Sequence, residues 1–91
     1  MTSKEELKRG IKLEQKLQEL GYQEEYCHIR NHKQFYKFYN LNKVVIIIEK
    51  NKLKREYISA TTIVSQENID NLQQAFNKMQ KDLAILKELE K

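Results

Sequence analysis

Five consecutive β-branched residues, Val44 to Ile48, constrain the fold of this 91-residue chain more than any other feature. The run is far shorter than the roughly 20 apolar residues that a helix needs to cross a bilayer. β-Branched side chains favour strands, and a continuous apolar run is typical of a strand that is covered on both faces. We therefore expect residues 44–49 to form the central strand of a sheet.

Three further strands are predicted around this run. Residues 34–40 are rich in Phe and Tyr, and residues 22–30 and 55–64 also have strand-forming composition. The chain has no proline that would exclude a position in a sheet. Short connections make successive strands hairpin neighbours, so an antiparallel meander of three to four strands is expected. The turns are predicted at residues 31–33, 40–43 and 51–52, where asparagine is frequent.

Residues 3–20 and 66–90 are expected to be helices. Gly21 follows the first segment at a position that suits a helix C-terminus, and Gly10 within it would permit close packing against the sheet. Both helices need a place for their apolar residues, and one face of the sheet offers it. The sequence thus predicts one α+β domain over residues 1–91, a β-meander flanked by an N-terminal helix and a long C-terminal helix in the order α-β-β-β-β-α.

The second helix carries an apolar stripe at alternating spacings of three and four residues, as in a coiled coil. Packing on the chain's own sheet is one interpretation of this stripe, and pairing with a second copy in a homodimer is the other. The stripe consists of Ile69, Leu72, Phe76, Met79, Leu83 and Leu86.

The net charge of +4 is concentrated in the middle of the chain, because residues 21–65 carry +4 while the flanking segments carry +1 and −1. A basic segment between nearly neutral ends favours an anionic partner, either a nucleic acid or an acidic protein surface. The same lysines also fit a purely solubilising role.

Residues that would support catalysis or metal binding are few. Cys27, His28 and His32 lack the fourth ligand of a structural zinc site, and Cys27 and His28 would point to opposite faces of a strand. Two glycines provide no phosphate-binding loop. We therefore expect a non-enzyme without metal or cofactor. The single cysteine and the charged N-terminal residues predict a cytoplasmic protein without membrane insertion.

Basic and aromatic residues alternate between His28 and Lys43. In a strand, Phe35, Lys37 and Tyr39 share one face, and Tyr36 and Phe38 share the other. One face would pack under the helices, and the other would present aromatic and basic groups to a partner. The candidate partner-binding residues are Arg30, Lys33, Lys37 and Lys43, with Tyr36 and Tyr39 as aromatic anchors.

In general style the chain resembles the small accessory proteins encoded by phages of AT-rich bacteria, a group that includes anti-CRISPR inhibitors. The resemblance depends on the length, the bias towards Lys, Asn and Ile, and a helix–meander–helix plan whose last strand and turn cover residues 58–67. It implies a non-catalytic protein that blocks a nucleoprotein enzyme, and it assigns no site residue.

Two functions are therefore expected. The first is a small inhibitor or binding protein that docks on a protein or nucleoprotein partner, such as a host defence nuclease. The alternative is a sequence-tolerant single-stranded nucleic-acid-binding protein that uses the basic and aromatic sheet face.

Overall fold

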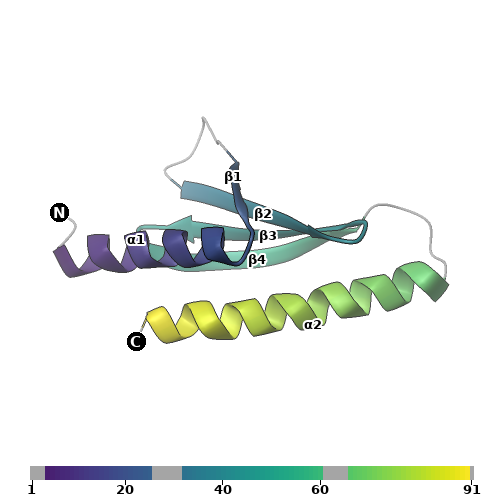
Figure 1. Ribbon diagram of the computed structural model, residues 1–91. Coiled ribbons are helices and arrows are strands. Elements are labelled where there is room, and N and C mark those ends of the chain that lie inside the picture. The colour runs from purple at the N-terminus through teal and green to yellow at the C-terminus, as the bar shows by residue number, and fades with distance from the viewer. Residues whose placement is uncertain (1–3, 26–31, 61–65, 91) are drawn as a thin grey trace.

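The computed structural model describes residues 4–25, 32–60 and 66–90, which form two helices and a four-stranded sheet (Figure 1). Their order confirms the α-β-β-β-β-α prediction. The predicted strand over 22–30, the predicted strand over 55–64 and the candidate residue Arg30 lie partly or wholly outside the described residues. The elements are α1 (Lys4–Glu19), β1 (Gln23–Glu25), β2 (His32–Tyr39), β3 (Asn42–Glu49), β4 (Lys52–Ala60) and α2 (Gln66–Leu89).

The strands lie in the order β1-β2-β3-β4, and each pair is antiparallel. β3 has a neighbour on both sides and all of Val44–Ile48 is buried, as the apolar run predicts. Lys50 and Asn51 adopt positive φ angles of 54° and 63°, which a two-residue hairpin turn requires.

The predicted turn over residues 31–33 is wrong for its last two positions. His32 and Lys33 belong to β2, where they pair with Glu49 and Ile48 of β3. Pairing with a long, apolar partner strand outweighs the local preference of these two residues for a turn. β2 is therefore as long as β3.

Gly21 ends α1 as expected. Its φ of 95° is a conformation that glycine adopts without strain. The Gly21 N–H donates to the Gln18 carbonyl at 3.0 Å, and the Tyr22 N–H donates to the Leu17 carbonyl at 2.9 Å. These two bonds are those of a Schellman motif. They turn the chain from α1 directly into β1.

Gly10 lies against the β3–β4 turn, which confirms the predicted close packing between helix and sheet. A Cβ atom at this position would lie only 2.8 Å from Cγ of Asn51. The neighbouring Arg9 donates from Nε to the Asn51 carbonyl at 3.1 Å. The contact fixes the first half of α1 to one end of the sheet.

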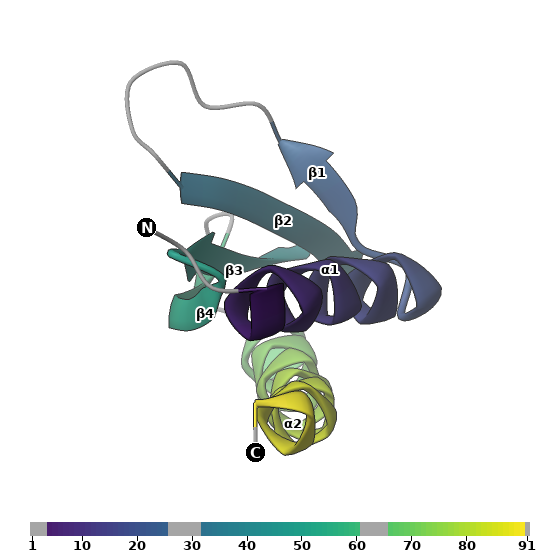
Figure 2. The same ribbon diagram turned by 90° about the vertical axis from the view of Figure 1, so that its left-hand side faces the viewer.

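Both helices cover the same face of the sheet (Figure 2). Phe35 from β2 and Val44, Ile46 and Ile48 from β3 point into the core on this face. The helices contribute Leu13 and Leu17 from α1, and Ala75, Met79, Leu83 and Leu86 from α2.

α2 is longer than the sheet that it covers. Its 24 residues span roughly 36 Å at about 1.5 Å per residue, whereas an eight-residue strand such as β3 spans roughly 26 Å at about 3.3 Å per residue. α1 lies beside the second half of α2, and the first turns of α2 extend past the β2–β3 turn (Figure 1). The first half of α2 therefore has less of the molecule to pack against.

Candidate functional site

No described helix covers the second face of the sheet, which we call the open face (Figure 2). Its residues follow from the strand registers and from the alternation of side chains along each strand. They form four cross-strand rows: Gln23–Tyr36–Val45–Tyr57, Glu25–Gln34–Ile47–Arg55, Phe38–Lys43–Ser59 and His32–Glu49–Lys52.

Aromatic rings occupy the centre of the open face. Val45 is only 1% exposed and lies between Tyr36 on β2 and Tyr57 on β4. Phe38 is 55% exposed, and its ring meets the Tyr36 ring edge-on at 6.1 Å and 82°. Tyr57 is also exposed. Large rings that remain accessible over a packed base are the kind of residue that dominates protein interfaces.

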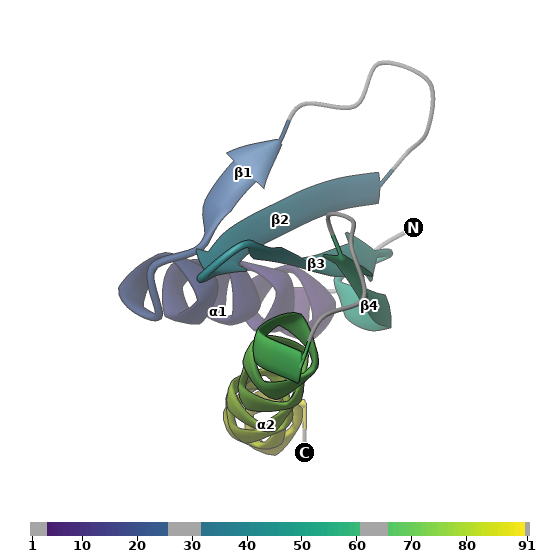
Figure 3. The ribbon, with the colours of Figure 1, turned by 90° about the vertical axis from the view of Figure 1, so that its right-hand side faces the viewer.

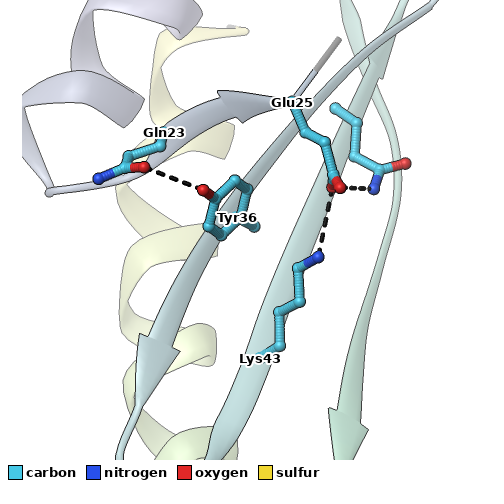
Figure 4. Close-up of polar contacts among 5 residues, drawn as sticks. Gln23, Glu25, Tyr36 and Lys43 are labelled. Carbon is cyan, nitrogen blue, oxygen red and sulfur yellow. Dashed lines mark hydrogen bonds and ion pairs between the residues drawn. The ribbon is translucent and has the colours of Figure 1, made fainter. Parts of the chain in front are cut away.

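Polar contacts hold β1 and β2 in place beside these rings (Figure 4). Tyr36 donates from its hydroxyl to Oε1 of Gln23 at 2.9 Å. Glu25 Oε2 accepts a 2.7 Å hydrogen bond from Gln34 Nε2 and lies 3.4 Å from Lys43 Nζ. The Lys43 ammonium also lies 4.8 Å from the centre of the Tyr36 ring. The site is thus ordered by bonds that leave the ring of Phe38 accessible.

The described residues of the open face carry a positive net charge, because four cations (Lys43, Lys52, Lys54 and Arg55) outnumber two carboxylates (Glu25 and Glu49). Lys43 pairs with Glu25, and Glu49 lies 3.7 Å from Nζ of Lys54, the residue at the irregularity in β4. Arg55 is exposed on the same face. Close pairs of opposite charge cancel much of each other's field, so the Lys43–Glu25 and Lys54–Glu49 pairs add little to the net charge of the face.

The candidate residues predicted from the sequence do not form one surface. Tyr36 and Lys43 lie on the open face, whereas Lys33, Lys37 and Tyr39 have the same parity as the core residue Phe35 and point to the helix-covered face. Alternation was predicted correctly, but both sets of β2 residues are aromatic, and nothing local shows which set the helices cover.

The two lysines on the helix-covered face already have partners within the chain. Lys33 Nζ lies 2.6 Å from Oε1 of Glu14 on α1, and this hydrogen bond raises the pKa of Lys33. Lys37 donates to the Leu20 carbonyl at 2.5 Å, where a cation is favourable because helix carbonyls converge at a C-terminus. Both lysines join α1 to the sheet.

Tyr39 belongs to a polar cluster inside the molecule. Tyr22 and Tyr39 both donate to Oδ2 of Asp82 on α2, at 2.8 and 2.6 Å. Burial, followed by the hydrogen bond to Asp82, raises the pKa of Tyr22 well above its usual value and that of Tyr39 to about 12. The Lys37 and Lys78 ammonium groups lie 5.0 and 5.1 Å from the centre of the Tyr39 ring. A phenol with a raised pKa gives up its proton less readily, so neither tyrosine is suited to act as an acid. The cluster therefore fits a structural role.

The sequence did not predict Asp82 and Tyr22 as members of a polar cluster. The available signal was an acidic residue between Met79 and Leu83, beside the apolar stripe of the second helix. A carboxylate at such a position requires hydrogen-bond donors if it is buried. The donors come from residues 60 and 43 positions earlier in the chain, and their approach is a property of the tertiary structure.

The predicted stripe of α2 divides into two parts. Met79, Leu83 and Leu86 are buried in the core, which confirms packing on the chain's own sheet for the second half. The first half remains accessible, with Ile69 49%, Leu72 38% and Phe76 46% exposed.

Residues 4–25, 32–60 and 66–90 contain neither a metal-binding cluster nor a membrane-spanning helix. No group of three or more His, Cys, Asp or Glu residues in these ranges has the arrangement of a metal site. Neither described helix has a stretch that is long and apolar enough to span a membrane. Cys27 and His28 lie outside the described residues.

Comparisons with known protein families, curated proteins and solved structures found no match to this chain.

Proposed function

We propose that this protein is a non-catalytic binding protein that docks on a macromolecular partner, foremost a protein surface, through the open face of its sheet. The observation that supports the proposal is the exposed ring of Phe38 beside Tyr36 and Tyr57, over a packed base at Val45. Aromatic residues with a polar rim are typical of the centres of protein interfaces.

The positions of the lysines predicted from the sequence favour a protein over a nucleic acid as the partner. Proteins that bind single strands without sequence preference need a groove of cations that follows the backbone. Of the lysines predicted for that task, Lys33 and Lys37 point to the other face, and Lys43 is paired with Glu25. Docking against a protein requires no such row of free cations.

The alternative function, sequence-tolerant binding of single strands, is favoured by one contact. The Lys43 ammonium lies over the Tyr36 ring, next to the exposed ring of Phe38. Bases stack on such rings while a neighbouring cation contacts a phosphate. This function predicts that affinity for an oligonucleotide falls by about tenfold or more as salt rises from about 50 to about 200 mM.

The decisive experiment compares capture from a lysate of the source cells by Phe38→Asp and by Ile11→Asp. The two residues are matched, because Phe38 is 55% and Ile11 51% exposed, but Ile11 lies on α1. We expect Phe38→Asp to lose the species that the wild type and Ile11→Asp both capture. Equal capture by all three proteins would reject the open face as the binding site.

A nuclease-treated arm of the same experiment separates the two classes of partner. A protein partner is retained after nuclease treatment, whereas a partner held through nucleic acid is lost. Salt-sensitive binding of a labelled single-stranded oligonucleotide by the purified wild type, abolished by Phe38→Asp, would establish the alternative instead. Inhibition of a host defence nuclease is the narrower form of the leading proposal, and it stays a prediction from the sequence.

A further inference from the structure

A hollow of about 150 Å³ lies on the open face, at the end of the sheet where β3 turns into β4. Its bottom is packed, because Ile47 is only 4% exposed. Figure 3, the view from the end where α2 begins, shows both helices together on the opposite side of the sheet, so no described helix covers the hollow. Three neighbouring strands line it, with His32 on β2, Ile47 and Glu49 on β3, and Lys54 and Arg55 on β4.

An irregularity in β4 brings two cations to this hollow. Along a regular strand, Lys54 and Arg55 would point to opposite faces. The register passes from Arg55 to Leu53 between consecutive residues of β3, so Lys54 is an extra residue without a partner of its own on that strand. A β-bulge of this kind redirects a side chain. Here it lets Lys54 line the hollow on the open face together with Arg55.

Arg55 is the cation of the hollow that is left without an acidic partner. Glu49 lies 3.7 Å from Nζ of Lys54 and is also the cross-strand neighbour of Lys52. Within residues 4–25, 32–60 and 66–90, no carboxylate lies within ion-pair distance of Arg55, whose side chain is exposed. A guanidinium group presents N–H donors in a planar fork that binds a carboxylate through two parallel hydrogen bonds. Arg55 can therefore bind an anion from outside the chain.

We infer that the hollow receives the side-chain carboxylate of an aspartate or glutamate of a partner protein. The inference deepens the proposed function and rests on it, because the hollow belongs to the open face. A site for a whole small molecule usually has a volume of about 300–1,000 Å³. The hollow has about 150 Å³, the volume of roughly five water molecules at about 30 Å³ each. It therefore has room for the end of one side chain.

The surroundings of the hollow favour a protein carboxylate over the phosphates of a nucleic acid. A nucleic acid strand repeats its negative charge at every nucleotide, so it needs cations that continue beyond the hollow. The next cross-strand row of the open face, which contains Tyr36 and Tyr57, carries no charge. The row of Arg55 itself ends at Glu25 on β1, which would repel a second phosphate. A single carboxylate requires neither of these positions.

The distance from the hollow to the rings predicts the spacing of the partner's contact residues. Arg55 and Tyr57 are two residues apart on β4 and share the open face. Their backbone positions are separated by roughly 7 Å, at about 3.3 Å per residue. An extended partner segment presents its own side chains on one face with the same period. We therefore expect an acidic residue over Arg55 and an apolar residue two positions away over Tyr57.

The direct test titrates the ¹⁵N-labelled protein with two blocked tripeptides, at up to about 10 mM, and follows the amide signals by NMR. Acetyl-Glu-Ser-Leu-amide carries the carboxylate, and acetyl-Gln-Ser-Leu-amide is its uncharged match. We expect the glutamate peptide to shift the signals of Lys54 and Arg55 and to bind about tenfold more tightly, because only a carboxylate forms charge-assisted hydrogen bonds with the guanidinium group. Equal binding of the two peptides, or no shift at the hollow, would overturn the inference.

Substitutions with opposite effects test the charges of the hollow. Arg55→Gln should weaken binding of the glutamate peptide by about tenfold. Glu49→Gln should tighten it by about threefold, because a like charge is removed and Lys54 loses its partner within the chain. Lys81→Gln is the control, since it removes one exposed cation from α2 and should leave binding unchanged. The same spectra show that each variant is folded. Weakening by Glu49→Gln, or equal weakening by Lys81→Gln and Arg55→Gln, would contradict the assignment.

Two further outcomes separate the inference from the proposals beside it. Displacement of the glutamate peptide from the hollow by a micromolar single-stranded oligothymidylate would assign the site to a nucleic acid and overturn the inference. Equal capture by Phe38→Asp and the wild type would reject docking through the open face, and the partner assigned to the hollow with it, even if the peptide binds. Loss of capture by Phe38→Asp together with failure of the peptide test would overturn the inference alone.

Discussion

The two faces of β2 carry similar residues, but the helices cover one face and leave the other exposed. On the helix-covered face, Phe35 is fully buried and Lys37 donates to the end of α1. On the open face, one strand position away in each case, Tyr36 donates to a glutamine at the surface and Phe38 is more than half exposed. In this strand, residue type therefore does not distinguish structural residues from candidate binding residues. What distinguishes them is whether the side chain points towards the helices or away from them.

The largest expected difference between the two faces is in the phenylalanines. Phe35→Ala should lower the free energy of unfolding by about 3–5 kcal/mol, because it leaves a cavity in the core. Phe38→Ala should lower it by less than about 1 kcal/mol, since solvent already reaches the ring. Urea denaturation followed by circular dichroism measures both. Equal losses would mean that the open face is as tightly packed as the core.

The next difference concerns the hydrogen bonds of the tyrosines. Asp82→Ala leaves the buried hydroxyl of Tyr22 and the partly buried hydroxyl of Tyr39 without their acceptor and should cost about 2–3 kcal/mol in unfolding free energy. Gln23→Ala removes the acceptor of Tyr36 on the open face and should cost under about 0.5 kcal/mol, because water replaces it. The same denaturation experiment applies. A smaller loss for Asp82→Ala than for Gln23→Ala would refute the structural role of the cluster.

The pH dependence of stability should reveal the two tyrosines that bind Asp82. Burial and the hydrogen bond to Asp82 raise the pKa of Tyr39 to about 12, and they also raise the pKa of Tyr22. In the unfolded chain, by contrast, a tyrosine has a pKa of about 10. The unfolded state thus releases its protons first. The stabilisation is present in full below about pH 10 and is lost as the pH rises from there towards about 12.

Unfolding free energies measured from about pH 8 to about pH 11 test this dependence. Tyr39→Phe should make the alkaline loss of stability shallower, because one group with a raised pKa is gone. Phe38→Ala, the control from the open face, removes no titratable group and should leave the slope unchanged. A slope that Tyr39→Phe does not alter would contradict the assignment.

The smallest expected difference is in the lysines. Lys37→Met removes the ammonium group at the C-terminus of α1 and should cost about 1 kcal/mol of unfolding free energy. Lys43→Met removes a partly exposed pair with Glu25 and should cost about 0–0.5 kcal/mol. Thermal melts of the two variants give the comparison. A larger loss for Lys43→Met would show that its pair with Glu25 holds the sheet together.

The order of elements was predictable because each signal is local. The run Val44–Ile48 predicted the central strand, Gly21 predicted the end of α1, and the stripe from Ile69 to Leu86 predicted a long amphipathic helix. The beginning of β2 was mispredicted, because His32 and Lys33 are held in the strand by pairing with β3. Strand ends depend on the partner strand, and the partner is not adjacent in sequence.

Only part of the candidate site was predictable from the sequence. Sequence alone determined that β2 carries two aromatic sets on opposite faces, since alternation is a property of the extended backbone. The tertiary structure decided that Lys37 and Tyr39 face the helices, because their partners are the carbonyl of Leu20 and the carboxylate of Asp82. It likewise decided which half of the α2 stripe is covered, because a helix longer than its sheet extends past the end of the core.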